Sequence, residues 1–188
     1  MTALLHDGSS PVQKDNDQFV QSSLRSDGLL LRFASDRLKG DSKTVICAVK
    51  QNGLALQYSK LRSGVHLAVY YALKNNGMAL EFASFSEPAA QFLEEPLSLV
   101  AVMNNGLALQ FCNYDRCTHY HTTLCALMQN GLALKYAGMY FKSNEKVALL
   151  AIRNNAAAIN YVNYAMRSDE EFIKKAVICN AEVSKFVC

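Results

Sequence analysis

The sequence predicts an all-α protein, an α-solenoid (superhelix) of about seven two-helix repeats of about 25 residues each. One motif recurs plainly in AVKQNGLALQYS (48–59), ALKNNGMALEFA (72–83), AVMNNGLALQFC (101–112) and ALMQNGLALKYA (126–137). Weaker copies are AIRNNAAAINYV (151–162), AVICNAEVSKFV (176–187) and SLRSDGLLLRFA (23–34). Tandem recurrence of a unit too short to bury its own apolar face is typical of solenoids.

The copies align on one column, which we number position 0. It contains Gly28, Gly53, Gly77, Gly106, Gly131, Ala156 and Ala181, at spacings of 25, 24, 29, 25, 25 and 25 residues. This spacing predicts repeats near 15–39, 40–63, 64–92, 93–117, 118–142, 143–167 and 168–188, in a single domain over 15–188. Residues 1–14 do not fit the pattern, so we expect a flexible leader there.

The columns before position 0 predict a first helix of about three turns. Position −5 is alanine in every copy except the first, which indicates a close approach of two helices. Bulky residues at position −4, and pairs at −9 and −8 such as Phe19 with Val20 or Val147 with Ala148, complete one helical face. We expect N-caps at Asp41, Ser143 and Ser168, the last within the capping-box sequence Ser-Asp-Glu-Glu, and Pro96 in a first helical turn.

The Asn-Gly pairs predict where the first helix ends, with the glycine in the left-handed conformation. Since Ala156 replaces that glycine, the bend after Asn155 should be strained by about 1 kcal/mol or be built differently, for example with Asn155 itself in the left-handed region. The following Leu-Ala-Leu-x-aromatic predicts a shorter second helix whose aromatic residue fills the space between neighbouring repeats. Neither helix is long enough to be stable alone, so stacking must stabilise both.

Two features depart from the regular pattern. The spacing of 29 residues places extra residues in SFSEPAAQFLEEP (84–96), where two prolines predict a bulged connection. The terminal copies have polar residues, Gln21 with Ser22 and Lys174 with Lys175, where inner copies are apolar. Because terminal repeats need a polar outer face, we expect the array to be nearly whole.

Composition limits the class of protein. With 51% hydrophobic and 19% charged residues, the chain can bury a core and is not of a disordered class. A net charge of +3 without a basic run argues against nucleic acid, and no apolar stretch is long enough to span a membrane. The start of the chain does not resemble a secretory signal. The six cysteines are interpreted as reduced core thiols in a cytosolic protein rather than a disulfide framework.

The repeated phrase A-V-x-x-N-G-x-A-L-x-[YF]-A, from about residue 15 to the end of the chain, resembles a family of short helical repeats known only as a domain of unknown function. The resemblance depends on Ala48, Asn52, Gly53, Ala55, Leu56 and Tyr58 with their equivalents. Such repeats occur in intracellular bacteria, including Legionella secreted effectors, and in protists. The resemblance brings no activity or cofactor with it, and it implies an effector delivered to the host-cell cytoplasm.

One cluster has the residue types of a metal site or a thiol enzyme: Cys112, Cys117, His119, His121 and Cys125. Its spacing matches no common zinc pattern, and residues two apart on a helix point in different directions. A catalytic thiol would also need an oriented base and an electropositive pocket. A zinc- or thiol-dependent enzyme using residues 112–125 therefore remains the alternative hypothesis, and we expect neither metal nor cofactor.

The favoured hypothesis is a non-catalytic scaffold that binds a protein or peptide. Position −3 is cationic or methionine in successive first helices, and position −10 on the same face includes His121. The predicted contact residues are Lys50, Lys74, Met103, Met128, Arg153 and His121. Methionine flanked by cations makes an adaptable surface for an acidic, partly apolar partner. The 84–96 segment is a second predicted contact region, and the asparagines at position −1 are interpreted as turn residues rather than a peptide-binding ladder.

Overall fold

The computed structural model describes residues 4–61, 65–83, 88–112 and 120–187. All regular secondary structure in this part of the chain is helical, as the sequence predicts. The chain divides into two compact units, Met1–Asn104 and Asn105–Cys188. Each unit consists of α-helices alternating with short 3-10 helices, which are labelled η.

The first unit has four longer α-helices. Its elements in chain order are α1 (Pro11–Lys14), α2 (Asp17–Ser26), η1 (Gly28–Phe33), α3 (Asp36–Lys39), α4 (Ser42–Gln51), η2 (Gly53–Tyr58), α5 (Val65–Asn75), η3 (Gly77–Phe82) and α6 (Pro88–Asn104).

The second unit repeats the same alternation. Its elements in chain order are η4 (Gly106–Phe111), α7 (Tyr120–Gln129), η6 (Gly131–Tyr136), α8 (Met139–Lys142), α9 (Glu145–Asn154), η7 (Ala156–Tyr161), α10 (Tyr164–Arg167), α11 (Glu170–Cys179) and η8 (Ala181–Lys185).

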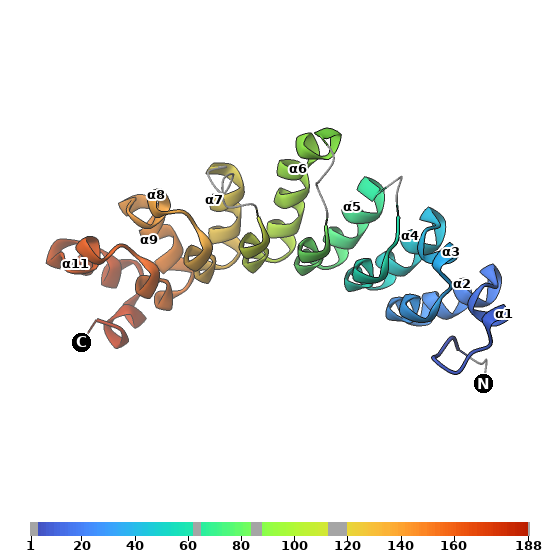
Figure 1. The fold of residues 1–188 in the computed structure, drawn as a ribbon. Coiled ribbons are helices and arrows are strands. Elements are labelled where there is room, and N and C mark those ends of the chain that lie inside the picture. Colours follow the sequence, from blue (N-terminus) through green and yellow to red (C-terminus); the bar gives the residue numbers. More distant parts are fainter. Residues whose placement is uncertain (1–3, 62–64, 84–87, 113–119, 188) are drawn as a thin grey trace. The chain divides into compact units, whose positions relative to one another are not determined.

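Sequential copies stack in two layers within each unit. In the first unit, α2, α4, α5 and α6 each pack on the next, and η1, η2 and η3 do the same (Figure 1). In the second unit, α7, α9 and α11 form one layer and η4, η6, η7 and η8 the other. This stacking of each copy on its neighbour confirms the α-solenoid class. The second helix of each copy is a 3-10 helix.

The first helices begin one residue later than some of the predicted caps. Asp41 caps α4 as expected, because its carboxylate accepts a hydrogen bond from the Thr44 N–H at 2.8 Å. The prediction for Ser143 and Ser168 is wrong. These serines are the C-caps of the four-residue helices α8 and α10, and the N-caps of α9 and α11 are Asn144 and Asp169.

The asparagine at position −1 forms the corner between the two layers. Asn52 ends α4 with φ −145° and ψ 110°, an extended conformation, while its N–H donates to the Ala48 carbonyl at 2.9 Å. Its side-chain oxygen accepts from the Leu54 N–H at 3.1 Å and so caps η2. Asn155 has the same geometry, with φ −150°. The expected left-handed or strained bend at Asn155 is therefore wrong.

The glycine at position 0 is required by a neighbouring backbone, not by a left-handed turn. None of the repeat glycines for which the structure describes the surroundings has a positive φ, so that prediction is wrong. A Cβ added at Gly53 would lie 2.3 Å from the Ala72 carbonyl oxygen of the next copy, and one at Gly131 would lie 2.2 Å from that of Ala151. Gly28 and Gly106 meet Ala48 and Ala126 in the same way. Glycine and the buried alanine at −5 together let two copies approach closely.

An amide side chain at position −2 holds this contact. The Gly53 N–H donates to the Asn75 side-chain oxygen of the next copy at 2.7 Å, and the Asn75 amide donates back to the Lys50 carbonyl at 3.1 Å. The same amide clamp joins five successive pairs of copies at 2.6–2.7 Å: Gly28 with Gln51, Gly53 with Asn75, Gly77 with Asn104, Gly106 with Gln129 and Gly131 with Asn154. The amides of Gln51, Asn75, Asn104 and Asn154 also donate to a carbonyl of the preceding copy, so these four clamps are charge-neutral, two-way connections.

The last junction is built differently. Position 0 is Ala156, and position −2 of the next copy is Cys179 instead of an amide. Asn180 makes the connection here, because its side-chain amide donates to the Ile152 carbonyl at 3.1 Å. Glycine and the amide are thus replaced together, as expected if each requires the other.

The 3-10 helices bury Ala and Leu rather than the aromatic residue. In η2, Gly53, Ala55 and Leu56 are buried, whereas Tyr58 is only half-buried. The last aromatic of the column, Phe186, is 43% exposed. The aromatic side chains are thus only partly buried, and Ala55 and Leu56 form the buried part of η2. The role of the aromatic column between copies stays a prediction.

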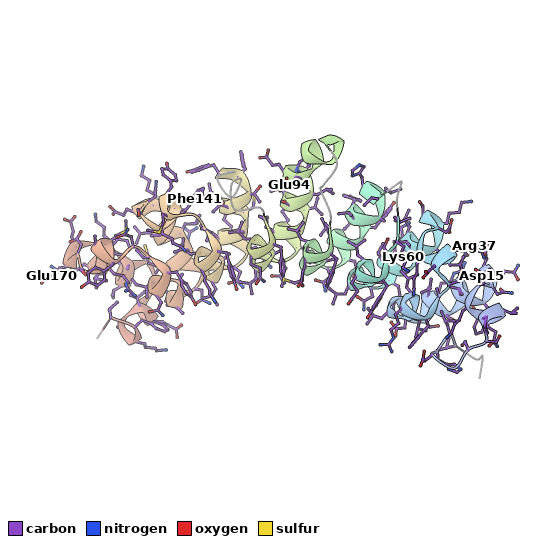
Figure 2. All side chains as sticks on the ribbon, in the orientation of Figure 1. Asp15, Arg37, Lys60, Glu94, Phe141 and Glu170 are labelled. Carbon is purple, nitrogen blue, oxygen red and sulfur yellow. The ribbon has the colours of Figure 1, made fainter. Side chains whose placement is uncertain are left out.

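A four-residue helix adds a further connection between some copies. The Lys60 N–H donates to the Lys39 carbonyl at the end of α3, and the Asn163 N–H donates to the Lys142 carbonyl at the end of α8, at 2.8 and 3.0 Å. Within α3, Arg37 forms an ion pair with Asp15 at 2.9 Å (Figure 2). It forms a second with Asp17 at 2.7 Å. Hydrogen bonds from Ser35 and Arg37 hold the pKa of Asp15 below its usual value.

The sequence pattern sets two segments apart, the expected leader 1–14 and the connection 84–96. Both are folded in the residues that the structure describes. In the expected leader, Leu5 is fully buried, its N–H donates to the Ser23 hydroxyl at 3.0 Å, and α1 follows. Within 84–96, residues from Pro88 onward belong to α6, so the predicted bulged connection is wrong there. Pro96 lies inside α6 instead of in its first turn. Residues 84–87 lie outside the described part.

We expect Gly53→Ala to lower the free energy of unfolding by about 1–3 kcal/mol, because the new methyl group overlaps the Ala72 carbonyl. Gly138→Ala is the matched control, since an added Cβ there meets nothing within 4 Å. That control should be neutral or stabilising by about 0.4–1 kcal/mol. Guanidinium denaturation followed by circular dichroism measures both, and equal effects would contradict the close-approach account.

We expect an amide clamp to form at the last junction only when Ala156 and Cys179 are both changed. Ala156→Gly alone should destabilise by about 0.5–1 kcal/mol, because glycine loses more chain entropy on folding. Cys179→Asn alone should have little effect while the Ala156 methyl group remains. In a double-mutant cycle, the double variant should be about 1 kcal/mol more stable than the sum of the two single effects predicts. Additive effects would show that glycine and amide act independently.

Candidate functional site

The predicted contact residues all lie on the exposed face of the first helices. Positions −5 and −4 are buried from α2 to α9, as with Ala48 and Val49 at 0% exposure, whereas Val177 at −4 of α11 is half-buried; position −3 lies at the edge of the solvent face. Met103 is 65% exposed and Met128 63%. The remaining predicted residues, Lys50, Lys74, Arg153 and His121, are also exposed.

These residues form two sets, one on each unit. Lys50 on α4, Lys74 on α5 and Met103 on α6 lie on sequentially packed helices of the first unit. His121 and Met128 on α7 pack beside α9, which has Arg153, in the second unit. We call the exposed faces of these helices the first-helix ridge, with one segment on each unit.

The sequence interpretation missed one member of the ridge. Ile178 occupies position −3 of α11 and is 84% exposed, the highest exposure among the large apolar side chains described. Extending the −3 column by one more copy would have found it. An apolar side chain so exposed beside Arg153 of the preceding copy extends the mixed apolar and cationic character of the ridge.

Position −7 and position −6 add half-buried apolar and aromatic side chains to the ridge. In α5, Tyr70 is 37% exposed and packs edge-on against Tyr71 at 5.5 Å between ring centroids. The Lys50 ammonium lies 4.2 Å from the Tyr71 ring centroid, which orients this cation across two copies. The ridge is thus cationic at one edge and apolar along its middle.

Carboxylates are scarce on this face. Helices α4, α5 and α7 contain no Asp or Glu at all. In the second unit, Glu145 and Glu171 both form ion pairs with Lys175, at 2.9 and 3.2 Å. Lys175 is therefore shared by both carboxylates and offsets one of their two charges, while the cations at position −3 give the rest of the ridge a positive character.

The residues of the alternative metal or thiol site are only partly described. Cys117 and His119 lie outside the described residues, as does the rest of 113–119. Cys112 and Cys125 are half-buried and His121 is exposed. Among the described residues, no three His, Cys, Asp or Glu side chains are arranged to hold a metal ion.

The cysteines are more accessible than the sequence suggested. Cys47 and Cys125 are half-buried free thiols at position −6, and Cys179 is an exposed free thiol. The prediction of core thiols is therefore wrong for these three positions. Cys47 and Cys125 at position −6 lie outside the buried −5 and −4 columns, and Cys179 is at position −2.

In the described part of the chain, no helix is both long and apolar enough to cross a membrane.

A separate aromatic cluster surrounds the buried ring of Phe141 (Figure 2). The exposed Tyr120 and Tyr140 pack on this ring, at 6.0 and 5.4 Å between ring centroids.

The family described as a domain of unknown function, DUF4116, matches residues 16–61, 123–167 and 144–188. The chain belongs to this family. The first match covers two successive copies, α2 with η1 and α4 with η2, and the last two matches overlap over 144–167. One family unit therefore corresponds to about two structural copies. No curated protein and no solved structure matches the chain.

We expect metal analysis of the purified DUF4116 protein to find no stoichiometric zinc. Alkylation under native conditions should modify Cys179 before Cys47 and Cys125, because Cys179 is exposed and the other two are half-buried. Peptide mapping by mass spectrometry resolves the three sites. Bound zinc, or a Cys125 that reacts faster than Cys179, would favour the enzyme hypothesis.

Proposed function

We propose that this DUF4116 protein is a non-catalytic scaffold that binds a protein partner through the first-helix ridge. The observation that carries the proposal is the exposed −3 column, in which cations and methionines recur copy after copy while α4, α5 and α7 have no carboxylate. Solenoids present such repeated columns as extended binding surfaces.

The chemistry of the column favours an acidic partner that also has apolar side chains. Exposed methionine is flexible and polarisable, so it adapts to varied apolar groups. Cations at the edge of the ridge attract carboxylates and set the register. A nucleic acid is less suited, because the net charge is only +3 and the middle of the ridge is apolar.

The family resemblance suggests where such a scaffold acts. Related repeats occur in secreted effectors of intracellular bacteria, so we propose a reducing cytosol as the site of action, and the host-cell cytoplasm if the chain is an effector. The free thiols Cys47, Cys125 and Cys179 are compatible with a reducing compartment.

We expect a ridge variant to lose its partners in a proximity-labelling or pull-down comparison with the wild type. The changes are Lys50→Glu, Lys74→Glu, Met103→Ser, Met128→Ser and Arg153→Glu. The matched control reverses three exposed cations on the 3-10 layer: Arg32→Glu, Lys135→Glu and Lys185→Glu. Partners lost in the ridge variant and kept in the control support the proposal. A ridge variant that keeps every partner contradicts it.

A further inference from the structure

A shallow hollow lies on the second unit between the packed helices α9 and α11. Its lining residues are Lys146, Leu149, Leu150, Arg153 and Cys179, and its volume is about 310 Å³. Ligand pockets generally span about 300–1,000 Å³, so this hollow is at the small end of that range. It has room for one or two side chains rather than for a whole small-molecule ligand.

The hollow lies at the junction where the amide clamp is absent. In the five clamped junctions an Asn or Gln side chain at position −2 reaches the preceding copy. At this junction, position −2 is Cys179, which is exposed and lines the hollow instead. Because Cys179 replaces the amide, this junction lacks the amide contact between copies. The weakly polar thiol lines one side of the open hollow instead.

The floor and the edges of the hollow have different chemistry. Leu149 and Leu150 provide the apolar floor, and Lys146 and Arg153 lie one on each side of them along α9. Lys146 and Arg153 are seven positions apart, which places them about 10.5 Å apart along the helix axis. Ile178, next to Cys179 in the chain, is an apolar side chain that is 84% exposed.

Both cations are available to a partner. Neither Lys146 nor Arg153 forms an ion pair with any residue in the described part of the chain. Glu145, the acidic neighbour of Lys146, is paired with Lys175 at 2.9 Å. No carboxylate lines the hollow. An apolar floor between two unpaired cations fits an apolar group between two anions.

We propose that this hollow binds an extended acidic peptide segment in which one apolar side chain enters between Leu149 and Leu150 while flanking carboxylates meet Lys146 and Arg153. Side chains two residues apart in an extended chain point the same way, at about 3.3 Å per residue. Acidic, apolar and acidic residues at positions i, i+2 and i+4 thus share one face over about 13 Å, within reach of two long flexible cations. The inference rests on the proposed scaffold function and names the partner chemistry at one place on its ridge.

The test uses the full chain and fluorescein-labelled ten-residue peptides in fluorescence anisotropy. The matching peptide has the core Asp-Ser-Leu-Ser-Asp. The shifted peptide has the core Asp-Ser-Ser-Leu-Asp, which keeps composition and charge but turns the leucine to the opposite face. A uridine decamer of RNA tests for binding of any polyanion.

We expect the matching peptide to bind at least about threefold more tightly than the shifted peptide and than the RNA, since a misdirected leucine loses its burial. The double variant Lys146→Gln with Arg153→Gln should weaken binding of the matching peptide about three- to tenfold. Lys135→Gln, an exposed cation on η6, should leave it unchanged. Thermal unfolding midpoints confirm that the variants are folded.

Equal binding of the two peptides, RNA binding as tight as peptide binding, or insensitivity to the double variant would overturn the inference. Its failure is distinguishable from failure of the scaffold proposal. If the ridge variant loses its cellular partners while the matching peptide does not bind, only the peptide chemistry at this hollow is wrong. If the peptide binds but the ridge variant keeps every partner, the scaffold proposal is wrong.

Discussion

One contact determines how the copies stack: the close approach of a glycine in one copy to an alanine carbonyl in the next. A methyl group at Gly131 would lie 2.2 Å from the Ala151 oxygen, so the column tolerates no side chain while the copies stay this close. The approach also brings the glycine N–H within 2.7 Å of the Asn154 amide. Sterics and hydrogen bonding therefore select glycine, alanine and an amide as a set, and a buried N–H left unpaired would be costly.

This set explains why the copies are interdependent. A ten-residue helix and a six-residue 3-10 helix are each too short to be stable alone, and both leave backbone groups unsatisfied at their ends. The asparagine corner satisfies some of these groups within a copy, and the amide clamp satisfies others between copies. Burial of the Ala-Leu pair of the 3-10 layer then adds the apolar stabilisation.

Much of the fold could be predicted because periodicity is a property of the sequence. The copy boundaries, the first helices and the small residue at −5 all follow from aligned columns. The glycine was misinterpreted because Asn-Gly is also the signature of a left-handed helix end, and only the neighbouring Ala72 carbonyl distinguishes the two causes. The amide at −2 was visible as a column from Gln51 to Asn154, but its partner lies in the preceding copy. The exposed ridge followed from helical phase, whereas the hollow beside Cys179 depends on packing between two helices.

The central claim is that each clamped glycine N–H is held by the next copy, and amide hydrogen exchange measured by NMR tests it most directly. Gly28, Gly53, Gly106 and Gly131 should exchange slowly, because their donors bond to Gln51, Asn75, Gln129 and Asn154. Ala156, at the junction where Cys179 replaces the amide, should exchange faster than all four. Glycine amides that exchange as fast as the Ala156 amide would contradict the account.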